Sequence, residues 1–240
     1  MRSNNRKNNE LRPMTIEKNF IENADASALI SFGKTRVICT ATIEESVPRF
    51  LKDTGKGWVT AEYAMLPASS NERIRREVSN GKQSGRTMEI QRLIGRSLRA
   101  AINLDDLGER SIYIDCDVIQ ADGGTRTTSI TGGMIVLHDA IQSLLDSQRL
   151  SVSPIQNFVS AISVGLVDNQ VMLDLDYIED SSAEVDMNLI MTDDGRFIEI
   201  QGTAEQTPFS ADHLAEFLSV GKAGISTIID TVKSSVIVPA

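Results

Sequence analysis

The chain of 240 residues lacks several features that would place it in a class at once. No apolar run approaches the roughly 20 residues that a membrane-spanning helix needs. Residues 1–12 are polar and contain no apolar signal-peptide core. The sequence also contains no low-complexity segment and no strong internal repeat. These absences predict a globular protein of the cytoplasm that has no membrane partner.

Cysteine and histidine are scarce, with two residues of each. Cys39 and Cys116 lie inside apolar, strand-like runs and show no metal-ligand spacing, so we predict buried free thiols in a reducing compartment. His138 and His213 each fall in an expected helix without a partner at ligand spacing. We therefore interpret both histidines as packing or surface residues rather than catalytic ones.

Apolar residues, in contrast, are plentiful: they make up 41% of the chain, enough for a sizeable core. This content predicts one large domain over residues 1–240, with approximate lobes at 1–150 and 151–240. The net charge of −9 averages two opposed regions. Residues 73–99 contain eight cations and two anions, whereas residues 174–186 contain six carboxylates and no base. Such segregation predicts one surface for a polyanion and another for a cation.

The order of the expected elements indicates the fold class. Apolar periodicity predicts helices over residues 84–103, 129–147 and 210–235. β-branched and alternating runs predict strands within 11–43 and at 111–119, 158–167, 171–177, 185–192 and 197–201. Hairpin turns are expected at 31–35 and 194–195, and much of the stretch 44–82 is expected to be long exposed loop. We therefore predict an α+β fold with two β-rich lobes.

A glycine turn at residues 121–133 is the most informative motif. An apolar strand runs into Gly123 and Gly124, and Thr125 and Arg126 precede an apolar-periodic helix. Glycines let the backbone approach an oxyanion, the free N–H groups of a helix start favour negative charge, and a guanidinium can add a bidentate grip. The motif predicts a phosphate site, and an ordinary tight turn is the alternative. Arg86, placed towards the apolar side of the helix 84–103, suits a recessed pocket beside it.

Two further segments carry chemistry. The acidic run from Asp174 to Asn188 places carboxylates around a turn and into a strand, a donor set that suits Mg²⁺ better than zinc. A solvated acidic face is the alternative for this run. The loop 71–83 is rich in arginine, which is typical of a segment that follows an RNA or DNA backbone.

Four long strings resemble ribonuclease PH: residues 57–67, 81–96, 114–126 and 174–188. The likeness extends from about Leu11 to the last helix. It implies the fold of ribosomal protein S5 domain 2 and a homo-hexamer built as a trimer of dimers. It also implies a phosphate-dependent 3′-to-5′ exoribonuclease, a tRNA nucleotidyltransferase that trims the 3′ ends of tRNA precursors and releases nucleoside diphosphates.

The resemblance assigns roles by position. The matches to the family's site for inorganic phosphate, the co-substrate, are Arg86, Gly124, Thr125 and Arg126, and Arg126 is also expected to be catalytic. Asp180 and Asp186 match its catalytic carboxylates, which are associated with Mg²⁺. Together these matches imply a phosphate site and a metal site in one active centre.

The basic loop matches the family less completely. Arg73 and Arg76 match positions that the resemblance links to RNA binding. Ala68 stands where the family commonly has arginine, which puts one RNA or interface contact in doubt. Arg75 stands where the family often has a small residue, so we expect Arg75 to compensate in RNA binding.

Two other functions compete with the enzyme. A non-catalytic RNA-binding ring subunit of an RNA-degrading assembly is expected to lack the phosphate arginines or the metal carboxylates, and this chain has both sets. A protein with an acidic site but no role in RNA metabolism would leave the basic segment 73–99 unexplained. RNA affinity that falls steeply with salt would indicate contacts to RNA phosphates, whereas absent or salt-independent binding would favour this last function.

Overall fold

The structure, a computed structural model, describes residues 2, 5–205 and 208–237. Its first sheet has five strands in the order β1-β2-β3-β5-β4. Their bounds are β1 (Met14–Lys18), β2 (Ala26–Phe32), β3 (Thr35–Glu44), β4 (Trp58–Met65) and β5 (Ser111–Gln120). The pairings are antiparallel except for β4, which runs parallel to β5. The carboxyl ends of β4 and β5 therefore lie together, next to the glycine turn that follows β5.

The second sheet has four antiparallel strands in the order β7-β6-β8-β9. Their bounds are β6 (Val159–Val167), β7 (Gln170–Leu173), β8 (Val185–Thr192) and β9 (Phe197–Ala204). β6 is buried along its whole length and β8 along most of it. Such continuous burial requires cover on both faces of the sheet, and this explains why both strands are apolar without alternation.

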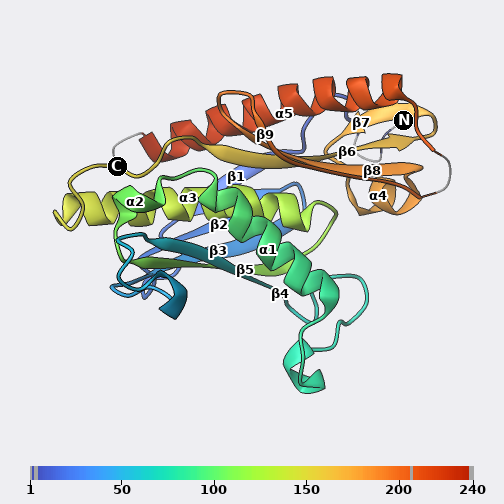
Figure 1. The fold of residues 1–240 in the computed structure, drawn as a ribbon. Helices are drawn as coiled ribbons and strands as arrows, with labels where there is room; N and C mark the ends of the chain where they lie inside the picture. Colours follow the sequence, from blue (N-terminus) through green and yellow to red (C-terminus); the bar gives the residue numbers. More distant parts are fainter. Residues whose placement is uncertain (1, 3–4, 206–207, 238–240) are drawn as a thin grey trace.

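Helices supply that cover in layers (Figure 1). α1 (Gly85–Arg99) and α3 (Thr125–Asp146) lie between the two sheets, and α5 (Ala211–Ile237) covers the far face of the second sheet. The short elements are α2 (Leu104–Leu107), α4 (Tyr177–Ser182) and the 3₁₀ turns η1 (Arg49–Leu51) and η2 (Glu77–Asn80). The α+β prediction is confirmed.

The helix α3 approaches the first sheet closely, as its glycines predict. A Cβ at Gly132 would lie 2.5 Å from Cys39 Sγ, nearer than atoms in contact can approach. Cys39 and Cys116 face each other across β3 and β5, and both are buried free thiols, as predicted. Within the described residues, no helix combines the length and apolarity needed to cross a membrane.

Much of the segment 44–82 is loop, as predicted, but it also contains the unpredicted strand β4, whose alternation is weak since two of its positions are alanine. Two predicted boundaries are wrong. The strand expected over 171–177 ends at Leu173, and α4 begins at Tyr177. α3 begins at Thr125 rather than near Ser129, because hydroxyls accommodate its polar first turns: Thr127 and Thr128 donate to Gly124 O.

Candidate active site

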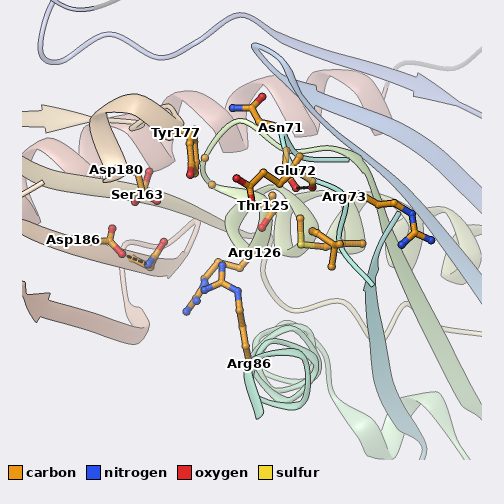
Figure 2. Close-up of a pocket in the computed structure, with 17 residues that line it drawn as sticks. Asn71, Glu72, Arg73, Arg86, Thr125, Arg126, Ser163, Tyr177, Asp180 and Asp186 are labelled. Carbon is orange, nitrogen blue, oxygen red and sulfur yellow. Dashed lines mark hydrogen bonds between the residues drawn. The ribbon is translucent and has the colours of Figure 1, made fainter. Parts of the chain in front are cut away.

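A cavity of about 640 Å³ lies where residues of the two sheets and their connecting segments meet (Figure 2). All six residues predicted for phosphate and metal binding line it, and so does Arg73. The lining residues with these predicted roles are Arg73, Arg86, Gly124, Thr125, Arg126, Asp180 and Asp186. Residues more than 90 positions apart in the sequence therefore share one pocket. In Figure 2, Arg86 and Arg126 lie on one side and the two aspartates on the other.

The glycine turn forms the back of this cavity. Gly123 and Gly124 have φ angles of 76° and 65°, in the left-handed region where glycine is favoured. A Cβ at Gly123 would lie 2.6 Å from the carbonyl oxygen of Leu175, so the turn packs directly on the backbone before α4. α3 starts at the next residue, Thr125, and its first N–H groups add positive potential at the turn.

Thr125 is held from behind the pocket. Its hydroxyl lies 2.8 Å from the hydroxyl of Tyr63, a buried residue of β4. Burial raises the pKa of Tyr63 above its ordinary value, at which a phenol is already protonated at neutral pH. Thr125 therefore has a fixed side chain, and its backbone N–H lies at the helix start.

Two arginines reach the cavity from different helices. Arg126, in the first turn of α3, donates to Gln201 Oε1 at 3.0 Å and lies 3.5 Å from Glu89 Oε2. These contacts from β9 and α1 hold its guanidinium while leaving part of it exposed. Arg86, in the first turn of α1, is exposed and extends towards Arg126 (Figure 2). Arg86 therefore lines the cavity, but its side chain is exposed and not recessed on the apolar side of the helix.

Asp180 and Asp186 come from α4 and β8. α4 is fixed at its start by a capping box, in which Asp176 accepts from the N–H groups of Ile178 and Glu179 and the Glu179 carboxylate accepts from the N–H of Asp176. Burial raises the pKa of Asp180 despite the opposing charges of Arg86 and Arg126.

The pKa of Asp186 is raised further, to about 6, first by burial and second by the charge of Asp180. Its Oδ1 is buried and accepts no hydrogen bond from the described residues, while Oδ2 accepts from Asn188 at 3.4 Å. A buried carboxylate oxygen without a donor is costly unless a ligand completes it.

The pair of carboxylates fits a Mg²⁺ ion. Mg²⁺ in phosphate-transfer sites is bound by one or two carboxylates together with phosphate oxygens and water. The unpartnered oxygen of Asp186, the adjacent charge of Asp180 and the arginines across the cavity match that donor set. Within the described residues, no cluster of three or more histidine, cysteine or acidic side chains is arranged to hold a metal ion.

The basic loop divides between two cavities. Arg73 lines the first, with its guanidinium directed away from the aspartates in Figure 2. Arg75 and Arg76 line a second cavity of about 880 Å³ between the loop and the first sheet. Its floor includes Asp115 and Asp117 of β5, whose pKa values are raised by burial and by the neighbouring Glu62. The three RNA-binding candidates therefore line two cavities that share Met65, Ile74 and Arg86.

Among the lining residues to which the sequence assigns no functional role are Asn188, Tyr177 and Ser163. The position of Asn188 could have been inferred from the sequence, since it lies two residues from Asp186 on the same strand and so on the same face. Tyr177, half exposed at the start of α4, belongs to the same acidic run. Nothing in the sequence indicates a role for Ser163, because it lies within a continuously buried strand. In the structure its hydroxyl accepts from the N–H of Leu175 at 3.1 Å.

Family comparison adds to this geometry. The sequence model of domain 1 of the 3′ exoribonuclease family matches residues 10–142, and that of domain 2 matches residues 157–224. The chain belongs to the 3′ exoribonuclease family. The boundary between the two matches falls between the two sheets, so the cavity receives residues from both. The resemblance to ribonuclease PH is confirmed at the level of the family.

Solved structures of low sequence identity share the fold over nearly the whole chain. Rice (Oryza sativa) Rrp46 is similar with a TM-score of 0.79 and 17% identity, covering 98% of this chain and 100% of that one. The Archaeoglobus fulgidus exosome with RNA bound to the active site is similar with a TM-score of 0.79 and 17% identity, covering 96% and 92%. An archaeal exosome core has a TM-score of 0.75 at 19% identity and covers 97% and 91%. These likenesses establish the fold.

Proposed function

We propose that this member of the 3′ exoribonuclease family is a phosphate-dependent 3′-to-5′ exoribonuclease that acts on tRNA precursors. The observation that carries the proposal is the pairing of two walls in one cavity. Arg86, Arg126 and the glycine turn form a site for an anion, and Asp180 and Asp186 face it. An anion site that faces two carboxylates able to hold a cation suits the binding of free phosphate beside a phosphodiester.

The residues present account for a phosphorolytic step. Arg86, Arg126 and the turn amides hold inorganic phosphate with one oxygen directed at the phosphorus of the last phosphodiester. That oxygen forms the new P–O bond as the bond from phosphorus to the 3′ oxygen breaks. The shortened RNA leaves with a 3′ hydroxyl after taking one proton, and a nucleoside diphosphate is released. Phosphate is already a charged nucleophile, so positioning supplies most of the rate and no strong general base is required.

Asp180 and Asp186 would hold Mg²⁺. When bound, the ion neutralises charge on the phosphoryl oxygens. The arginines on the opposite wall orient the phosphate and balance the charge of the aspartates. The product keeps its energy in a phosphoanhydride, so nucleotide addition is expected when diphosphate is abundant.

Partners follow from the same proposal. The Archaeoglobus fulgidus exosome has RNA bound to its active site, and this supports RNA as the polymer that the present chain binds. The exosome structures likewise support a ring, here a homo-hexamer arranged as a trimer of dimers.

A second candidate function is a non-catalytic ring subunit of an RNA-degrading assembly. The similar structures of exosomes and of rice Rrp46 favour it more directly than they favour tRNA trimming. The phosphate arginines and the two aspartates, all present and facing one cavity, favour the enzyme.

Product analysis tests the proposal. The purified chain is given a tRNA precursor with a 3′ extension and Mg²⁺, with and without inorganic phosphate, and nucleoside diphosphates are separated from monophosphates. The matched control is Arg126→Ala prepared in the same way, which reveals any contaminating nuclease. We expect diphosphates only from the unaltered chain and only with phosphate.

The other outcomes are equally distinct. Monophosphates in the absence of phosphate mean hydrolysis and refute the anion site. RNA bound but uncut under all conditions refutes the enzyme and supports the non-catalytic subunit. Light scattering of the same preparation measures whether six chains assemble.

A further inference from the structure

The carbonyl oxygens of the glycine turn are tied down on the side away from the cavity. Thr35 Oγ1 donates to Gly123 O at 2.7 Å and accepts from the N–H of Asp122 at 2.9 Å. Arg12 Nη1 donates to Asp122 O and has a longer contact of 3.5 Å with Gly123 O. Neither Thr35 nor Arg12 lines the cavity, whereas Gly123 and Gly124 do. The turn is therefore held from behind by two side chains.

This anchoring aims the amides of the turn. In a trans peptide the C=O group and the following N–H point in opposite directions, and the described part of the chain contains no cis bond. With Asp122 O and Gly123 O directed backwards, the N–H groups of Gly123 and Gly124 are directed forwards. Among the described residues neither N–H has an acceptor, so both are available to an oxyanion.

Arg12 is itself immobilised by the second half of the chain. Its guanidinium forms a two-point pair with Asp174, with Nη2 2.7 Å from Oδ1 and Nε 3.1 Å from Oδ2, and its backbone N–H donates to Oδ2 at 2.7 Å. Only 3% of Arg12 is exposed. Asp174 lies at the end of β7, six residues before Asp180. One side chain thus joins the phosphate turn to the segment that carries the carboxylates.

We propose that Arg12 is a positioning residue for phosphate, which holds the glycine turn so that its amides face the anion. The inference rests on the proposed phosphate-dependent function. A planar guanidinium can bond the Asp174 carboxylate with one edge and a turn carbonyl with another, whereas a lysine ammonium is a point charge that cannot span both. Arg12 does not touch the cavity, so its effect on phosphate passes through the turn.

The sequence offers a matched control. Arg2 forms a buried two-point pair with Glu179, at 2.8 and 2.7 Å, and donates to Asp174 O at 3.0 Å, but it contacts neither the Asp174 carboxylate nor the turn. Arg12→Lys and Arg2→Lys each break one buried fork. Thr35→Val is a further test, because it removes the other anchor without altering any charge.

The test measures phosphate binding in two ways for these variants. The first is the KM for inorganic phosphate, set against kcat at saturating phosphate. The second is the rise in melting temperature that phosphate produces without RNA or Mg²⁺, a readout independent of turnover. We expect Arg12→Lys to raise the KM for phosphate about tenfold or more, the factor given by loss of ~1.4 kcal/mol, and to suppress the thermal shift. Thr35→Val should act in the same direction.

The control is expected to leave both phosphate readouts within about twofold of the unaltered chain, and RNA affinity without phosphate should be unchanged in all three variants. Equal KM values for Arg12→Lys and Arg2→Lys, with Thr35→Val unchanged, overturn the positioning role while leaving the phosphate site in place. An unaltered chain that neither binds phosphate nor releases diphosphates overturns the proposed function, and the role of Arg12 with it. If Arg12→Lys fails to fold, Thr35→Val against Arg2→Lys decides the question.

Discussion

Alanine at Gly123 should destabilise the protein more than alanine at Gly124, although both glycines have left-handed φ angles. A Cβ at Gly123 would lie 2.6, 2.7 and 2.9 Å from backbone atoms of Leu175, Asp176 and Tyr177. A Cβ at Gly124 would lie 3.1 Å from two side-chain atoms, of Arg12 and Thr127. A contact of 3.1 Å needs a shift of only a few tenths of an ångström, whereas contacts below 3.0 Å with backbone require the backbone before α4, fixed by its capping box, to move. The two variants therefore differ in packing while sharing the same conformational strain.

The expected magnitudes follow from these contacts. The left-handed conformation costs an alanine about 1–2 kcal/mol, and this applies to both variants. The overlap at Gly123 adds an overpacking cost of about 1–3 kcal/mol, because the turn and the start of α4 must move apart. We expect a free energy of unfolding lowered by about 1–2 kcal/mol for Gly124→Ala and about 2–5 kcal/mol for Gly123→Ala. For a chain of this size the difference corresponds to roughly 2–12 °C in melting temperature.

Thermal and urea unfolding of both variants, at one protein concentration and without ligands, measures this difference. Equal shifts for the two variants, or a larger shift for Gly124→Ala, would refute the claim that the turn packs on the α4 backbone. Gly123→Ala should also lose phosphorolysis, because separating the turn from α4 moves the phosphate site away from Asp180.

Three further predictions concern the walls and the loop. Arg126→Ala should lower diphosphate release by about a hundredfold or more while its thermal unfolding changes little, since the side chain is partly exposed; a collapse of the melting temperature would make Arg126 structural. Asp180→Asn or Asp186→Asn should reduce turnover far more than RNA affinity measured by filter binding, and equal losses would contradict a mainly catalytic role. Arg75→Ala and Arg76→Ala should each weaken RNA binding and reduce the slope of log Kd against log salt by about 1; unchanged slopes would exclude phosphate contacts there.

The sequence predicts the local parts of the candidate site well. Two glycines after an apolar strand predict a turn with left-handed residues, and Gly123 and Gly124 adopt it. The apolar face of the helix 84–103 predicts the buried side of α1, which includes Ile90, Leu93 and Leu98. Such features depend on neighbours within a few residues, so composition and spacing carry them.

Contacts between distant segments could not be predicted in the same way. The pair of Arg12 and Asp174 joins residues 162 positions apart, and Arg12 occurs in a polar segment with no periodicity. A polar segment is usually exposed. The side chains of Arg12 and Asp174 are nevertheless almost fully buried, because their opposite charges neutralise each other. The start of α4, in contrast, is predictable from the sequence, since Asp176 and Glu179 have the spacing of a capping box.

The segregation of charge along the chain has its physical meaning only in the folded site. The basic segment contributes Arg86 to one wall, and the acidic run contributes Asp180 and Asp186 to the other. Within each wall the charged groups have the same sign and repel one another. The charge of Asp180, for example, helps raise the pKa of Asp186 to about 6. Facing walls of opposite sign reduce this cost but do not remove it, because Asp186 Oδ1 has no donor among the described residues. A cation beside the aspartates would relieve this cost, and an anion beside Arg86 and Arg126 would offset the repulsion between the two arginines. The arrangement therefore favours a cation and an anion bound side by side.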